Sequence, residues 1–167
     1  MKTILLMRHA KAEPGTAGQR DYDRVLSGRG SEDAARMGRA ISRLSLVPGA
    51  IVSSPAARAK ETAEAAAKAM GFAGTIKMER ALYNAAGDTW IAVIRALPSA
   101  ADVALVVAHS PGVAEAAALL CGARSRTFDV ATGAVLAFDD DAERWRDLGE
   151  GEASMRWFLR PKLVERL

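Results

Sequence analysis

Residues 102–111 read Asp-Val-Ala-Leu-Val-Val-Ala-His-Ser-Pro. The apolar run within residues 102–108 predicts a strand that is buried on both faces of a sheet. Ser110 and Pro111 are typical of a helix start, because serine is a good N-cap and proline fits the first helical position. The apolar residues that follow predict a helix that continues to about Cys121.

Two further buried strands are predicted nearer the N-terminus, and one of them is again followed by a Ser-Pro helix start. Residues 3–7 predict a buried strand that ends at Arg8-His9, and residues 49–53 predict another. Ser54-Pro55 then predicts the start of a helix over 55–70 that ends at Gly71. The remaining expected elements are a loop over 10–25, a helix over 28–45, a strand over 75–79, a helix over 89–97 that Asp88 caps and Pro98 stops, and strands over 134–138, 143–148 and 153–159 with a hairpin around Asp139 to Asp141.

Strands that alternate with helices predict an α/β fold. We expect a three-layer α/β/α sandwich whose central sheet is mostly parallel and has an antiparallel edge formed by the C-terminal strands. The chain has 167 residues, which suits a single domain over 1–167.

Composition excludes several classes of protein. Half of the residues are hydrophobic and 26% are charged, which is typical of a globular protein. The formal net charge is only +3 and no long basic run occurs, so nothing predicts a nucleic-acid partner. The single cysteine, Cys121, has no partner for an internal disulfide or a metal motif. The apolar run near the N-terminus is too short for a signal peptide or a membrane span, so we expect a cytoplasmic location and no membrane partner.

The chain contains two histidines, and each follows directly on a buried strand. A single histidine at a strand end is more often structural than catalytic. His9 and His109, however, occupy matching places, and ligands of open α/β sheets bind at the carboxyl ends of the strands. The pair therefore favours a functional site at that edge of the sheet.

Arginines accompany the histidines and favour a phosphoryl ligand. Arg8 precedes His9, and Arg58 lies in the first turn of the helix that Ser54-Pro55 opens, although a single helix arginine is usually just solvated. Guanidinium groups offer paired donors to phosphate oxygens, and helix N-termini attract anions. An imidazole can act as a nucleophile and carry a covalent phosphoryl group. Two histidines without a carboxylate or cysteine cluster make a poor zinc site, so we expect no metal and no cofactor.

Four motifs of the chain, in the same order, resemble those of the histidine phosphatase superfamily, whose members include phosphoglycerate mutases and acid phosphatases. Met7-Arg8-His9-Ala10 is similar to the family's Arg-His-Gly signature, with alanine in place of glycine, as in small phosphohistidine phosphatases of the SixA type. The other three segments are 21–30 (Asp-Tyr-Asp-Arg-Val-Leu-Ser-Gly-Arg-Gly), 52–63 (Val-Ser-Ser-Pro-Ala-Ala-Arg-Ala-Lys-Glu-Thr-Ala) and 107–112 (Val-Ala-His-Ser-Pro-Gly).

The resemblance implies roles for particular residues. His9 corresponds to the nucleophile that becomes phosphorylated, a role that the residues alone do not distinguish from that of His109. Arg8, Arg58 and His109 correspond to the phosphate pocket, and Arg24 matches an arginine that also reaches phosphate. The fold that the resemblance implies is phosphoglycerate mutase-like.

Two departures from the family affect the substrate. Many relatives carry a glutamate general acid in the segment that here reads Ala81-Leu82-Tyr83-Asn84-Ala85-Ala86-Gly87-Asp88, where Asp88 is the nearest carboxylate and therefore the candidate general acid. A phosphohistidine leaving group protonates readily, whereas an ester needs a proton donor. The spacing from Arg58 to His109 also leaves no room for a large cap insertion, so we expect an open site that suits phosphohistidine in a protein. The alternatives are a phosphatase of small phosphate esters or phosphorylated metabolites and, from another class, a noncatalytic phosphate-binding module.

Overall fold

The computed structural model describes residues 1–166, in which six strands form a mixed sheet in the order β3-β2-β4-β1-β5-β6. The strands are β1 (Lys2–Arg8), β2 (Ala50–Ser53), β3 (Ile76–Met78), β4 (Val103–Ala108), β5 (Val135–Asp140) and β6 (Ser154–Leu159). The helices are α1 (Gly28–Arg43), α2 (Ala57–Met70), α3 (Gly87–Arg95), α4 (Gly112–Cys121) and the short α5 (Pro161–Val164).

The sheet is parallel over most of its width. β1 pairs with β4, β4 with β2, and β2 with β3, all in parallel. β5 then runs antiparallel to β1, and β6 antiparallel to β5. The expected mostly parallel sheet with an antiparallel edge is therefore confirmed.

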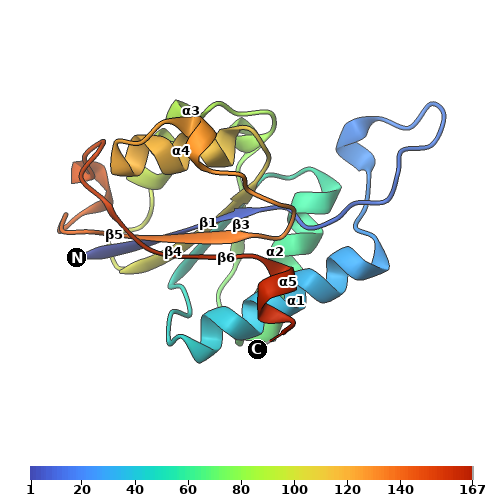
Figure 1. Ribbon diagram of the computed structural model, residues 1–167, viewed down its shortest axis with the longest axis horizontal. Helices are drawn as coiled ribbons and strands as arrows, with labels where there is room; N and C mark the ends of the chain where they lie inside the picture. The colour runs from blue at the N-terminus through green and yellow to red at the C-terminus, as the bar shows by residue number, and fades with distance from the viewer. Residues whose placement is uncertain (167) are drawn as a thin grey trace.

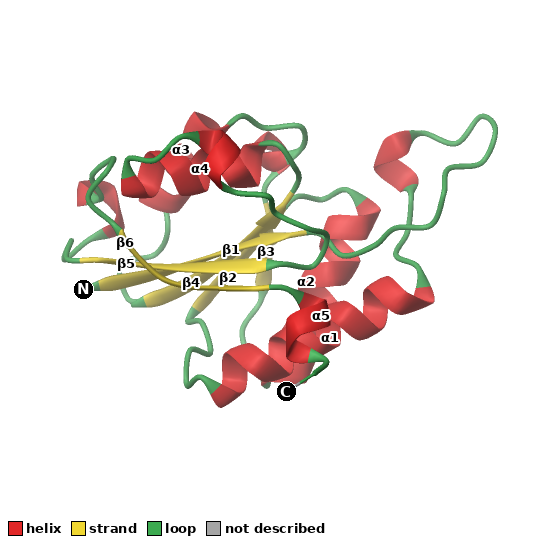
Figure 2. Ribbon diagram, in the orientation of Figure 1, coloured by secondary structure: helices red, strands yellow, loops and turns green. Residues whose placement is uncertain are grey.

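Helices cover both faces of the sheet and make it a three-layer α/β/α sandwich. Figures 1 and 2 show α3 and α4 over one face and α1, α2 and α5 over the other. Side chains alternate between the two faces along each strand, so β1 sends Ile4 and Leu6 toward α3 and α4 and sends Leu5 and Met7 toward α1 and α2. Because both faces are covered, β1 is buried almost throughout, as its continuous apolar run predicts.

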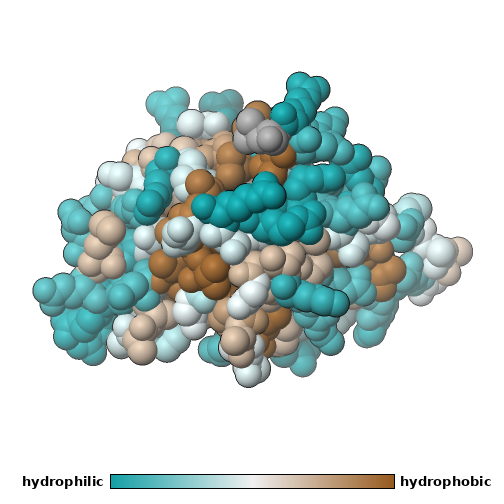
Figure 3. All heavy atoms as spheres, turned by 90° about the horizontal axis from the view of Figure 1, so that it is seen from below, coloured by the Kyte–Doolittle hydropathy of each residue, from teal (hydrophilic) through white to brown (hydrophobic). Residues whose placement is uncertain are grey.

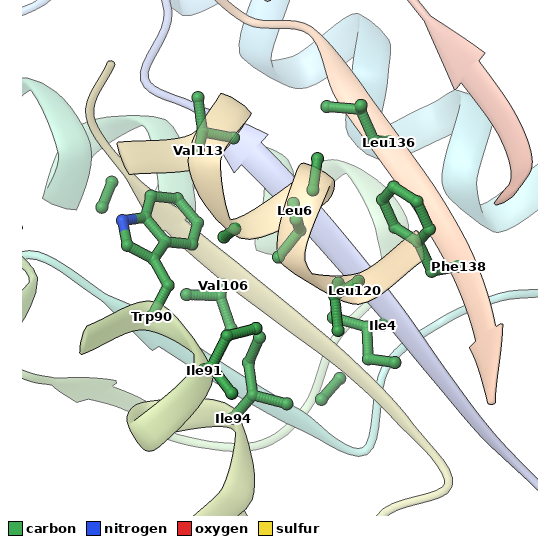
Figure 4. Packing of buried hydrophobic residues seen from close by; sticks show 14 of the residues in the cluster. Ile4, Leu6, Trp90, Ile91, Ile94, Val106, Val113, Leu120, Leu136 and Phe138 are labelled. Atoms are coloured by element: carbon green, nitrogen blue, oxygen red, sulfur yellow. The ribbon is translucent and has the colours of Figure 1, made fainter. Parts of the chain in front are cut away.

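The core beneath α3 and α4 contains the larger side chains. Trp90, Ile91 and Ile94 of α3 pack against the sheet beside Val113 and Leu120 of α4 (Figure 4). The opposite core is built mostly from alanine and methionine, which lets α1 and α2 approach closely. Seen from below, this opposite face carries hydrophilic atoms over much of its area, with separate hydrophobic patches between them (Figure 3). Within residues 1–166, no helix is long and apolar enough to cross a membrane.

One expected strand is wrong. Residues 143–148 contain a short 3-10 helix at Trp145–Asp147 rather than a strand. The apolar residues there are buried individually: Trp145 donates its Nε1–H to the carbonyl of Ala101 at 2.9 Å, and Leu148 packs in the same core. The antiparallel pair of β5 and β6 exists, but residues 141–153 connect the two strands instead of a tight hairpin around Asp139 to Asp141.

The expected helix starts are also displaced. α2 begins at Ala57 with Ala56 as its N-cap, and α4 begins at Gly112 with Pro111 as its N-cap, so neither Ser54 nor Ser110 caps a helix. Asp88 does not cap α3 either, because that helix already begins at Gly87. The N–H of Gly87 instead donates to Oε2 of Glu115 on α4 at 2.9 Å. A side chain distant in sequence thus replaces the local cap.

Candidate active site

The carboxyl ends of three neighbouring parallel strands bring the predicted residues together. β2, β4 and β1 lie side by side, and their last residues precede Ser54, His109 and His9 respectively. The N–H of His9 donates to the carbonyl of Ala108 at 2.9 Å, which keeps the two strand ends in register. The rings of His9 and His109 lie 5.2 Å apart between centroids. The two histidines therefore share one site, as their positions in the sequence predict.

The two ring nitrogens of His9 have different partners. Nδ1 lies 2.8 Å from the carbonyl oxygen of Ala10, which can only accept, so Nδ1 carries the proton. Nε2 then has a lone pair, and it accepts a hydrogen bond from Nε–H of Arg58 at 3.3 Å. This tautomer presents Nε2 as the nucleophilic atom of the ring.

The start of α2 fixes the position of Arg58. This arginine lies in the first turn of that helix and is 6% exposed. Thr62, one turn later, donates its hydroxyl to the carbonyl of Arg58 at 2.6 Å and accepts the N–H of Ala10 at 3.0 Å. This buried threonine links the helix that carries Arg58 to the residue that follows His9.

Ser54 determines the tautomer of His109. Its Oγ lies 2.8 Å from Nε2 of His109 and also accepts the N–H of Ala56 at 3.3 Å. Ser54 is buried and, among residues 1–166, its hydroxyl has no other acceptor, so it donates to Nε2 and the proton of the neutral His109 ring resides on Nδ1. Nδ1 is buried and has no partner within the described part of the chain.

Arg8 supplies a second buried donor without a partner. Its Nη1 donates to the carbonyl of Val130 at 2.8 Å, which fixes the outer part of the guanidinium. Its Nε is buried and, among residues 1–166, finds no acceptor. Buried donors without acceptors are rare in native proteins and call for an explanation. Arg8 Nε and His109 Nδ1 are both N–H donors of the kind that an anionic ligand satisfies.

Burial keeps both histidines uncharged. Desolvation, with smaller contributions from the nearby cations Arg58, Arg8 and Arg24, lowers the pKa of His9 to about 4 even though the hydrogen bond to Ala10 opposes the shift. Desolvation, followed by the proximity of His9 and Arg58, lowers the pKa of His109 to about 3. At neutral pH His9 therefore keeps the lone pair that a nucleophile needs.

Arg24 is linked to Arg58 through Asp21, a residue whose role the sequence does not predict. Its Nη1 donates to Oδ1 of Asp21 at 3.1 Å, and Oδ2 of Asp21 accepts from Nη2 of Arg58 at 2.9 Å. The hydroxyl of Tyr83 also donates to Oδ2 at 3.1 Å, and the Tyr83 ring stands edge-on to His109 at 5.5 Å. The segments containing Asp21 and Tyr83 stand out in the sequence, but nothing in them indicates these contacts.

Asp88 is exposed in the first turn of α3, and its side chain does not cap that helix. The carboxylate in direct contact with the pocket is instead that of Asp21. Partial burial tends to raise the pKa of Asp21, but hydrogen bonds from Arg58, Arg24 and Tyr83 outweigh it and lower that pKa below its usual value. Asp21 is therefore ionised at neutral pH and has no proton to donate.

The site places a neutral imidazole beside cationic side chains and N–H donors. Such a set can bind a phosphoryl group and receive it on nitrogen. Among residues 1–166, no group of three or more His, Cys, Asp or Glu side chains could hold a metal ion. Fold and site together define the class of phosphoryl-transfer proteins that use histidine.

The chain belongs to the histidine phosphatase superfamily, branch 1, whose family model matches residues 4–93. That match includes the segments with Arg8, His9, Asp21, Arg24 and Arg58. Family membership supports a phosphatase, and it confirms the resemblance that the sequence motifs indicate.

Known relatives agree with this placement. An uncharacterized chloroplastic protein of Arabidopsis thaliana is 32% identical over 131 residues, which cover 73% of this chain and 60% of that protein. The structure assigned as the phosphohistidine phosphatase SixA of Nakamurella multipartitia is 26% identical, with a TM-score of 0.83 and 96% of each chain covered. The structure of the protein histidine phosphatase SixA complexed with tungstate has a TM-score of 0.84 at 21% identity and covers 97% of this chain and 99% of that one.

Proposed function

We propose that this protein hydrolyses phosphohistidine carried by other proteins, through a covalent phosphohistidine intermediate at His9. The observation that carries the proposal is the arrangement around Nε2 of His9. This atom has the lone pair of the ring and accepts the Nε–H of Arg58, and the nearby Arg8 and His109 each have a buried donor without a partner among residues 1–166.

In the first step, the hydrogen bond from the Nε–H of Arg58 passes from Nε2 of His9 to a phosphoryl oxygen, Nε2 attacks phosphorus, and the bond from phosphorus to the substrate nitrogen breaks. The electron pair of that bond remains on the leaving imidazole, which takes up a proton from solvent. Arg8, Arg58 and the Nδ1–H of His109 stabilise the charge on the phosphoryl oxygens during transfer. In the second step, water attacks the phosphorus on His9, inorganic phosphate leaves, and the lone pair returns to Nε2.

The leaving group decides between substrates. An ester leaves as an alkoxide that needs a proton donor in the transition state. Asp21 has a lowered pKa and is paired with arginines, and Asp88 is exposed on α3. An imidazole leaving group needs no such donor, because it is protonated near neutral pH. The absence of a protonated carboxyl among the contacts described for His9 and Arg58 thus favours phosphohistidine over small phosphate esters.

Access to the site suits a substrate on a protein. His9 and Arg8 remain partly exposed, although they follow a strand that is otherwise buried. Similarity to structures assigned as SixA adds support. We further propose that the activity needs no metal, since the cationic Arg58 and Arg8 close to His9 would repel a metal ion.

The test is phosphate release in EDTA from a phosphohistidine-bearing protein and from an aryl phosphate, with the wild type and His9→Ala. We expect the wild type to prefer phosphohistidine strongly, the variant to lose release by at least ~1,000-fold, as expected when a covalent nucleophile is removed, and acid-labile phosphate to be trapped on the wild type only. Release from the aryl ester alone would favour a small-molecule phosphatase. Equal rates in the variant would overturn the role of His9, and phosphate binding without release from either substrate would indicate a binding module.

A further inference from the structure

Asp21 joins the two arginines at the mouth of the candidate site. Its two carboxylate oxygens accept from Arg58 Nη2 at 2.9 Å and from Arg24 Nη1 at 3.1 Å. Its backbone carbonyl accepts from Arg58 Nη1 at 2.7 Å, and Tyr83 donates to the same carboxylate. Both terminal nitrogens of Arg58 are therefore bound by a single residue.

These contacts divide the guanidinium of Arg58 into two parts. The terminal nitrogens face Asp21, whereas Nε–H faces Nε2 of His9 at 3.3 Å. A guanidinium has five N–H groups, and three of them are engaged here, so donors remain for a phosphoryl group while Asp21 stays in place. The geometry is that of a residue that orients Arg58, not of one that a ligand must displace.

We propose that Asp21 is a positioning residue that holds Arg58 with its Nε edge against His9, so that the guanidinium is in place when phosphorus is transferred. This inference rests on the proposed roles of His9 and Arg58. Preorganised donors need no reorganisation during the reaction, and a displacement of about 1 Å can reduce the rate about 100-fold.

Charge gives this role a distinctive signature. Arg8, Arg24 and Arg58 are all cations, and Asp21 is the carboxylate that Arg24 and Arg58 share. Removal of Asp21 would free Arg58 to move away from the other cations, which lowers the rate of transfer. The same change makes the pocket more positive, so inorganic phosphate should bind at least as tightly as before. A competing view, in which Asp21 blocks Arg58 until phosphate displaces it, predicts tighter binding with an undiminished rate.

The experiment compares Asp21→Ala and Asp21→Asn with Asp23→Ala. Asp23 is a matched control, because Asp21 and Asp23 lie in one 3-10 helix, Asp21–Asp23, and the carboxylate of Asp23 pairs with the exposed Arg20 instead of Arg58. We expect Asp21→Ala to lower kcat about 10- to 100-fold while the Kd for orthophosphate, measured by calorimetry, stays equal or decreases. Asp21→Asn keeps an acceptor, so its kcat should lie between those of the wild type and Asp21→Ala. The kcat of Asp23→Ala should stay within about twofold of the wild-type value, as for an ordinary surface change.

A second readout does not depend on turnover. In ¹H–¹⁵N spectra, the Nε–H of Arg58, assigned by its loss in Arg58→Lys, should exchange slowly with water in the wild type and in Asp23→Ala, and faster in Asp21→Ala. An unchanged kcat, an unchanged exchange rate, or a joint loss of kcat and phosphate affinity in Asp21→Ala would overturn the inference. If the wild type releases no phosphate from any substrate, the proposed function fails, and the exchange rate still decides whether Asp21 positions Arg58.

Discussion

At the scale of single residues, the site depends on which nitrogen of each histidine carries the proton. The carbonyl of Ala10 places the proton of His9 on Nδ1, and the hydroxyl of Ser54 places that of His109 on Nδ1 as well. The consequences differ: His9 has its lone pair at Nε2, where it accepts from Arg58, whereas His109 has an N–H donor at Nδ1. Two identical side chains thus take opposite chemical roles because their partners differ.

Ser54→Ala tests the assignment for His109. Without the hydroxyl, Nε2 loses its donor and the ring populates both tautomers, so the Nδ1–H donor is present only part of the time. The loss of one hydrogen bond, about 1–1.5 kcal/mol, should lower kcat/KM about tenfold. Ser53→Ala is a matched control, because Ser53 is an equally buried neighbour whose hydroxyl donates to the carbonyl of Ser54 instead. Equal losses in the two variants, measured by steady-state kinetics, would show that Ser54 acts only through packing.

The sequence predicts the residues at strand ends but not their long-range partners. Arg8, His9 and His109 follow apolar runs that are recognisable without a structure, and all three lie in the site. Asp21 and Tyr83 are 62 positions apart and meet only in the folded protein. A contact of this kind leaves no periodicity or local motif, since it depends on where two loops cross the edge of the sheet.

At the scale of elements, the buried strands are the most predictable part of the fold. β1, β2, β4 and β5 lie where the apolar runs indicate, because strands covered on both faces need continuous apolar sequence. Helix starts are less predictable. Ser54 has the chemistry of an N-cap, but its hydroxyl bonds to His109, and α2 begins at Ala57 instead. The local preference of serine for the N-cap position is overridden here because the same hydroxyl bonds to a side chain distant in sequence.

The contact between α1 and α2 supplies a prediction at this scale. A Cβ on Gly38 of α1 would lie 2.3 Å from the carbonyl oxygen of Ala66 on α2, and backbone cannot yield as a flexible side chain can. Gly38→Ala should therefore lower the free energy of unfolding by about 1–3 kcal/mol, as overpacking does. Gly28→Ala, at the start of the same helix with open space around it, should be neutral or slightly stabilising. Urea unfolding of the two variants gives the comparison, and equal stabilities would contradict the proposed contact.

At the scale of the whole molecule, the fold holds a cationic, partly desolvated pocket at the carboxyl ends of the buried central strands. The two layers of helices bury β1 and β4 almost to their last residues, and a histidine follows each of these strands directly. Burial there keeps both imidazoles neutral. This lowers the free energy of unfolding only at a pH where the histidines of the unfolded chain bind protons. Stability should therefore depend on pH through the same two groups that the site uses.

The direction of that dependence follows from the pKa values. An unfolded histidine has a pKa near 6.5, whereas the folded protein holds His9 at about 4 and His109 at about 3. Between pH 6.5 and about 4 the unfolded chain binds more protons than the folded one, so the free energy of unfolding should decrease as the pH falls through this window and stay free of this effect above it. Carboxylates such as Asp21 add their own loss of unfolding free energy at lower pH.

The double variant His9→Gln and His109→Gln keeps every carboxylate and removes both histidine titrations. Its free energy of unfolding, measured in urea from pH 7.5 to 4.5, should therefore decrease less steeply than that of the wild type. Parallel curves for the wild type and the double variant would mean that folding does not lower the pKa of these histidines. Burial would then not explain why His9 is neutral.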